Sequence, residues 1–201
     1  SFLHNTLKNI NKEASGLVDH FTYVIASDGD MQEPITLGSA SLSGHLGLSK
    51  LIVFYDSNEM QISGGVSRSD STDYGVIFKG FGWHVQKIDG HDHDSIRIAI
   101  REAQKSNQPS LIIGETIMAK GSDGMEGDFN THGAPLPQDE IDATKIKLGI
   151  ESEPFFLPEE VITYFKSDFQ SQTNKVKSWN NKLTLMQQNL DLKKNLLLEF
   201  F

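Results

Sequence analysis

Cysteine is absent from the 201 residues of this chain, which excludes disulfide bonds and a thiol nucleophile. Basic residues are also scarce: 18 lysines and arginines stand against 27 aspartates and glutamates, and the formal net charge is −9. Because nucleic acids and anionic membranes attract positive surfaces, this balance argues against broad binding to either. No apolar run reaches the roughly 18 residues that a membrane span needs, and no signal peptide is visible at the start. We therefore expect a cytoplasmic protein that binds neither nucleic acid nor membrane.

What the sequence does contain is an alternation of two kinds of segment. Short runs rich in β-branched and aromatic residues predict strands at 22–27, 50–55, 84–88 and 110–117. Segments with helical features lie between them, at 34–49 and at 94–106, where Asp94 is the expected N-cap. Continuous apolar strands separated by helices are typical of an α/β fold with a parallel sheet and helices on both faces.

The rest of the chain divides into a loop and a tail. Residues 118–137 form a long glycine-rich stretch, and loops of this length in compact domains are usually functional or disordered. From about residue 150 the sequence becomes polar with spaced leucines, which predicts amphipathic helix. We expect an α/β domain over 1–150 and a helical linker over 151–201.

The stretch "SDGDMQEP" at 27–34 places carboxylates directly after the first strand. A carboxylate there can hold a hard divalent cation, and a following glycine lets the backbone approach a ligand closely. Asn58 lies 30 residues after Asp28, an interval filled by a helix and a second strand. Because parallel strands open their carboxyl ends on one side, both residues should share a ligand-binding edge. Taken alone, Asp28 is as well explained as a helix cap, and Asn58 as a turn residue.

A family resemblance sharpens this interpretation. The segments "VDHFTYVIASDGDMQE", "LSKLIVFYDSNEMQISG", "GFGWHVQKIDGHD", "PSLIIGETI" and "THGAPL" follow one another in the order and spacing of the transketolase family, which uses thiamine diphosphate. The similarity runs from about residue 19 to residue 149 and resembles the diphosphate-binding domain of that family. The tail "PFFLPEEVITYF" resembles, more weakly, the linker that precedes the family's pyrimidine-binding domain.

The resemblance implies a set of cofactor ligands. Asp28 and Asn58 correspond to side chains that bind Mg²⁺, or Ca²⁺ in its place, and Met60 would add a backbone carbonyl. Gly29 would face the diphosphate, and Ile62 would pack near the thiazolium ring.

Two further residues correspond to catalytic positions. His132 matches a histidine near the diphosphate and the substrate, and Glu33 matches a glutamate that couples two active sites across a dimer interface. The alternatives are an exposed loop histidine for His132 and a plain surface carboxylate for Glu33. The chain departs from the family pattern at four neighbouring positions, which are Ser27, Pro34, Gly38 and Ser57.

The implied function is transketolase activity, the reversible transfer of a two-carbon ketol unit between sugar phosphates. The family's ring-activating glutamate and its sugar-phosphate ligands lie on a pyrimidine-binding domain, and upstream histidine and glycine-rich motifs are missing here. The chain would then be the cofactor-anchoring part, inactive alone, and would work as a homodimer or with a chain that carries the other domain. "SNEMQIS" also resembles 1-deoxy-D-xylulose-5-phosphate synthase, and a non-catalytic remnant or assembly module stays open.

Other conspicuous residues have less specific interpretations. The cluster at 91–93, "HDH", is expected to face solvent and to cap a helix rather than to bind metal. Trp83 and Phe81 are expected in the core. Small side chains in the segment 34–49 suit either a close subunit interface or packing on the chain's own sheet.

Overall fold

The computed structural model describes residues 17–62 and 64–188. Of these, residues 20–152 form one compact unit, and residues 17–19 with 153–188 form another. The expected linker region beyond residue 188, and the first 16 residues of the expected α/β domain, lie outside the described residues.

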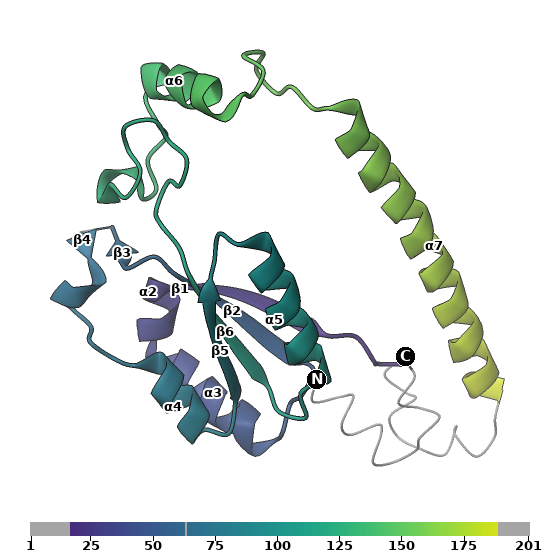
Figure 1. Cartoon of the computed structure of the whole chain (residues 1–201). Helices are drawn as coiled ribbons and strands as arrows, with labels where there is room; N and C mark the ends of the chain where they lie inside the picture. Colours follow the sequence, from purple (N-terminus) through teal and green to yellow (C-terminus); the bar gives the residue numbers. More distant parts are fainter. Residues whose placement is uncertain (1–16, 63, 189–201) are drawn as a thin grey trace. The chain divides into compact units, whose positions relative to one another are not determined.

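The first unit is built on a four-stranded parallel sheet (Figure 1). Its strands are β1 (Thr22–Ser27), β2 (Leu51–Ser57), β5 (His84–Asp89) and β6 (Ser110–Glu115), in the order β1-β2-β6-β5. Each strand coincides with one of the runs of β-branched and aromatic residues that predicted it. A short hairpin of β3 (Met60–Gln61) and β4 (Gly64–Gly65) extends beyond the end of β2.

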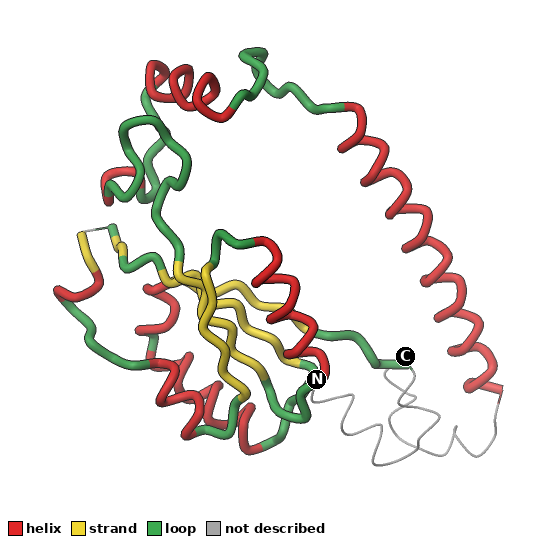
Figure 2. Tube along the Cα trace, in the orientation of Figure 1, coloured by secondary structure: helices red, strands yellow, loops and turns green. Residues whose placement is uncertain are grey.

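Helices cover both faces of this sheet, as Figure 2 shows. Helix α5 (His93–Lys105) covers one face, where Ala99 and Ala103 pack with the strand residues Ile52 and Ile112. The other face is covered by α2 (Asp28–Gln32), α3 (Pro34–His45) and α4 (Tyr74–Gly80), around a core that includes Met31, Phe78 and Trp83. The predicted α/β fold with a parallel sheet between helices is confirmed.

Several boundaries differ from those expected. Helix α3 ends at His45 rather than near residue 49, because the chain turns at Gly47 with a left-handed φ of 59°. The N-cap of α5 is Asp92, not Asp94, since the Asp92 carboxylate accepts a hydrogen bond from the Asp94 N–H at 3.0 Å. Helix α4 and helix α6 (Gln138–Leu148) were not predicted.

The small residues of α3 allow a close approach within the chain. Ala40 is buried, and its carbonyl accepts a hydrogen bond from Trp83 Nε1 at 2.8 Å. A Cβ added to Gly44 would lie 1.8 Å from the carbonyl oxygen of Phe81. At these two positions, therefore, small size is required by packing on the chain's own core. The expected burial of Trp83 is also observed, and Phe81 packs against the same core.

Gly44→Ala should destabilise the chain by about 3 kcal/mol, because the new methyl group must displace backbone atoms of Phe81. Gly38→Ala is the matched control on the same helix, since a Cβ there meets nothing within 4 Å. The control should be more stable than the wild type by about 0.5–1 kcal/mol, through helix propensity alone. Urea unfolding followed by circular dichroism measures both, and equal stabilities would contradict the close approach of α3.

The second unit contains the long helix α7 (Glu159–Gln188). The indole of Trp179 donates a hydrogen bond from Nε1 to the carbonyl of Leu17 at 2.8 Å. Several large apolar side chains of α7 are exposed, including Tyr164, Phe165 and Phe169. Throughout residues 17–62 and 64–188, no helix combines the length and apolar character needed to cross a membrane.

Candidate functional site

The carboxyl ends of β1 and β2 place the candidate site. The two strands run parallel with Ser27 beside Asp56, so the chain leaves both strands at the same edge of the sheet. Asp28 is the first residue after β1, and Asn58 is the first after β2. The Asn58 N–H donates a hydrogen bond to Asp28 Oδ2 at 3.2 Å. The two residues that the sequence singled out are therefore in direct contact.

The Asp28 carboxylate is buried. Only 2% of the residue is exposed, and its second oxygen, Oδ1, accepts a hydrogen bond from the Tyr55 hydroxyl at 2.5 Å. Within the described part of the chain no lysine, arginine or histidine forms an ion pair with it. A buried carboxylate that accepts hydrogen bonds only from neutral donors has no positive partner, and a bound cation would supply one.

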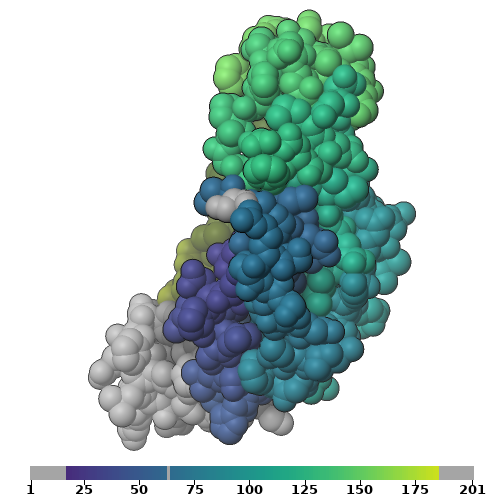
Figure 3. All heavy atoms as spheres, turned by 90° about the vertical axis from the view of Figure 1, so that its left-hand side faces the viewer, coloured from purple at the N-terminus to yellow at the C-terminus, as the bar shows by residue number. Residues whose placement is uncertain are grey.

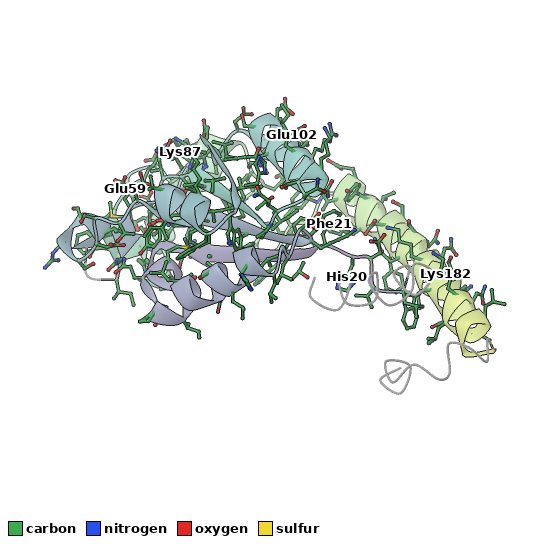
Figure 4. All side chains as sticks on the ribbon, turned by 90° about the horizontal axis from the view of Figure 1, so that it is seen from below. His20, Phe21, Glu59, Lys87, Glu102 and Lys182 are labelled. Atoms are coloured by element: carbon green, nitrogen blue, oxygen red, sulfur yellow. The ribbon has the colours of Figure 1, made fainter. Side chains whose placement is uncertain are left out.

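A basic side chain of the strand β5 pairs with a carboxylate of the neighbouring strand β6. On β5, Lys87 Nζ lies 2.8 Å from Glu115 Oε1, and the hydrogen bond from this lysine to Glu115 raises the lysine's pKa. Figure 4 labels Lys87 and, on the loop after β2, Glu59. A metal ion at Asp28 would therefore add positive charge to an edge that is rich in carboxylates.

The loop after β2 is sharply turned. Glu59 has a left-handed φ of 60°, which is rare for a residue with a side chain and often marks a functional loop. Asn58 Oδ1 accepts a hydrogen bond from the Met60 N–H at 2.9 Å, and Asn58 Nδ2 donates to Asp56 Oδ2 at 3.3 Å. These bonds fix the asparagine side chain and the start of β3 relative to each other.

A cavity of about 320 Å³ opens beside this loop. It brings together residues from three separate segments, which are Ser27, Gly29, Asp30, Asn58, Met60, Gln61, Ile62 and His132. At Gly29 an added Cβ would meet nothing within 4 Å, so the backbone there faces open space. Figure 3 shows the hairpin segment against the loop that follows β6. Five of the residues implied by the family resemblance thus line one cavity, and the buried Asp28 lies between the lining residues Ser27 and Gly29.

A second carboxylate stands at the cavity wall. Asp30 Oδ2 accepts hydrogen bonds from the backbone N–H and the hydroxyl of Ser27, each at 2.8 Å. These two bonds, the backbone one first, lower the pKa of Asp30 below its usual value. Asp30 is thereby occupied in holding the turn that presents Asp28 and Gly29.

Glu33 lies elsewhere. It is exposed at the junction of α2 and α3, and it is not among the residues that line the cavity. Its role in coupling active sites stays a prediction.

The long loop after β6 carries His132 to the cavity. Its backbone folds back where the Gly127 N–H donates to the Met118 carbonyl at 2.8 Å. Asp128 then caps the short helix η3 (Phe129–Thr131), accepting from the Asn130 N–H at 2.9 Å, and His132 ends that helix. The glycine-rich stretch is therefore an ordered loop that delivers one side chain to the site.

The start of this loop is held by a residue that the sequence assigned to solvent. The Ile117 N–H donates a hydrogen bond to His91 Nε2 at 2.8 Å. The imidazole is otherwise exposed, as expected, and Asp92 is a cap. No group of three or more His, Cys, Asp or Glu side chains in the described residues is arranged to hold a metal, and this includes 91–93.

The donors at the cavity suit a hard cation. One carboxylate, one side-chain amide and backbone carbonyls are oxygen ligands of the kind that Mg²⁺ and Ca²⁺ prefer, especially when a phosphate completes the shell. Sequence reasoning missed Tyr55, which looked like an ordinary member of an apolar strand. Its contact with Asp28 depends on the register of β1 and β2, in which Tyr55 lies beside Ala26.

Comparison with known proteins identifies the same domain. The sequence profile of the transketolase thiamine diphosphate-binding domain matches residues 3–200. Transketolase 2 of Vibrio parahaemolyticus is 43% identical over 173 residues, which cover 86% of this chain and 26% of the relative. The transketolase of Halalkalibacterium halodurans is 40% identical over 173 residues, covering 85% of this chain and 26% of that one.

Solved structures agree. The transketolase of Campylobacter jejuni superposes with a TM-score of 0.85 at 34% identity, covering 91% of this chain and 29% of its own. A variant transketolase from Pichia stipitis, solved in complex with fructose 6-phosphate, has a TM-score of 0.87 at 31% identity, covering 95% and 29%. The chain thus spans about a quarter of the length of these relatives. With this match over nearly its whole length, the chain belongs to the family of transketolase thiamine diphosphate-binding domains.

Proposed function

We propose that this chain anchors thiamine diphosphate through a divalent cation and serves as the cofactor-binding part of a transketolase. The observation that carries the proposal is the buried Asp28 carboxylate, with neutral hydrogen-bond donors, next in sequence to Gly29 in a cavity that Asn58 and His132 also line. The family membership supports it independently.

The residues present fit this cofactor. Asp28, Asn58 and the backbone of Met60 would hold Mg²⁺, or Ca²⁺ in its place, because all three can offer oxygen atoms at one edge of the cavity. Gly29, with no side chain, would let the diphosphate approach the backbone. Ile62 is 77% exposed beside the cavity, and a bound thiazolium ring would cover it.

When bound, thiamine diphosphate supplies the carbon nucleophile that moves a two-carbon ketol unit from a ketose phosphate to an aldose phosphate. The contribution of this chain is to bind and orient. His132 stands at the cavity wall, where its imidazole can hydrogen-bond a substrate oxygen and exchange a proton with it. Glu33 would act outside the cavity, at a contact with a second subunit.

The cationic side chains that are absent from the cavity indicate which partners the chain needs. Its walls bear one histidine and no arginine or lysine, so the sugar phosphate needs cationic ligands from another segment. We propose a homodimer, or a complex with a chain that carries the pyrimidine-binding domain, as the active form. The outward side of α3, which includes the exposed Gly38 and Ser41, is the part of that helix free to contribute to the contact. The cytoplasmic location stays a prediction from the sequence.

Isothermal titration of the chain with thiamine diphosphate tests the proposal. We expect weak binding that requires Mg²⁺ and disappears with EDTA, because the diphosphate and the carboxylates repel each other without a cation. Thiamine without its diphosphate is the control ligand and should not bind measurably. Binding that is equal with and without the metal would refute the proposal, and an assembly module without cofactor would show no binding at all.

A further inference from the structure

Tyr55 makes the closest contact to the Asp28 carboxylate. We infer that Tyr55 is a positioning residue: its hydroxyl orients the Asp28 carboxylate for the cation while leaving the carboxylate's charge uncompensated. This inference rests on the proposed function, since it concerns the same cation site.

The geometry divides the carboxylate between two donors. Tyr55, from β2, donates to Oδ1 at 2.5 Å, and the Asn58 N–H, from the following loop, donates to Oδ2 at 3.2 Å. A carboxylate has about four acceptor positions, so each oxygen keeps capacity for a further ligand. With one bond at each oxygen, the plane of the group is fixed, and so are the directions in which a cation can be bound.

The chemical type of the donor matters as much as its position. A lysine or arginine at this place would fix the carboxylate equally well but would neutralise it and compete with a metal ion. A phenol donates a hydrogen bond without adding charge. A phenol keeps its proton at neutral pH, so the Tyr55 hydroxyl remains a donor.

A second tyrosine holds the ring of the first. Tyr55 and Tyr74 are both buried and pack edge to face, with ring centroids 6.0 Å apart. The Tyr74 hydroxyl donates instead to Asp70 Oδ2 at 2.7 Å. The ring of Tyr74 supports Tyr55, whereas the Tyr74 hydroxyl does not touch Asp28, which gives the experiment its control.

The experiment compares Tyr55→Phe with Tyr74→Phe in the full chain. Mn²⁺ replaces Mg²⁺, saturating thiamine diphosphate is present, and electron paramagnetic resonance reads the free Mn²⁺. We expect Tyr55→Phe to weaken Mn²⁺ binding about 10-fold, the usual effect of losing a hydrogen bond to a metal ligand. Tyr74→Phe also loses one hydroxyl that donates to a carboxylate but should change the affinity less than about 2-fold. Both titrations are run at a temperature at which circular dichroism shows both variants folded.

The outcomes separate the inference from the proposed function. Equal Mn²⁺ affinity of the wild type and Tyr55→Phe overturns the inference alone. Equal losses in both variants, in step with their melting temperatures, also overturn it, because they indicate a purely structural role. A wild type that takes up no more Mn²⁺ than Asp28→Asn overturns the proposed function and the inference with it.

Discussion

Asp28→Ala should lower the affinity for thiamine diphosphate in the presence of Mg²⁺ by more than about 100-fold, because it removes the buried carboxylate that would hold the cation. Isothermal titration at constant Mg²⁺ measures the loss. Asn58→Ala should weaken binding less, since a neutral ligand is lost and water can take its place. The expected order is therefore wild type, Asn58→Ala and then Asp28→Ala, from tightest to weakest.

The control for Asp28→Ala is a carboxylate of the same kind at a distant place. Asp94 is exposed on α5 and pairs with Arg97 at 2.7 Å, so Asp94→Ala should leave cofactor affinity unchanged. Thermal melting of each variant shows whether a loss of binding reflects a loss of folding. If a folded Asp28→Ala chain bound the cofactor with wild-type affinity, Asp28 would not be a ligand of the metal ion.

The 201-residue chain by itself should show no ketol transfer at any concentration of thiamine diphosphate and Mg²⁺. The cavity wall offers His132 but no cationic side chain for a sugar phosphate, and the chain spans about a quarter of the length of its transketolase relatives. A coupled assay with xylulose 5-phosphate and ribose 5-phosphate measures turnover. An intact transketolase, such as that of Campylobacter jejuni, serves as the positive control under the same conditions.

Turnover by the purified chain would show that the missing groups are supplied within it, and the account of an incomplete site would have to be abandoned. Absence of turnover together with Mg²⁺-dependent binding is the combination that the proposed function expects. Absence of both would leave an assembly role as the better explanation.

The parts of the fold that the sequence predicted are those set by local composition. Continuous β-branched runs marked the four strands of the sheet, and a single crossover between the first two placed Asp28 and Asn58 at one edge. The sequence did not predict helix α4, because this helix is short. It also contains Gly75 and Gly80, which interrupt the helical spacing of its apolar residues. Whether Asp92 or Asp94 is the N-cap of α5 depends on where the turn before the helix ends. Composition alone cannot distinguish two aspartates that are two residues apart.

The parts of the site that could not be predicted depend on contacts between distant segments. Tyr55 reaches Asp28 only because β1 and β2 pair in one register, and His91 binds Ile117 only because the chain returns to that place after β6. Alternation of residue types along a strand cannot reveal either contact. The family resemblance implied which residues bind the cofactor. The residues that position them, such as Tyr55, could be identified only from the three-dimensional structure.

Strand β1 has a consequence for the behaviour of the protein in solution. It lies at one end of the sheet, and no strand of the described residues pairs with its outer edge. Ile25 is 83% exposed and Tyr23 52%. Among the described residues this edge is unpaired, and an unpaired apolar strand edge is a template for pairing with other polypeptides, which is the usual beginning of aggregation. We therefore expect self-association through this edge to affect the concentration at which the chain can be kept in solution.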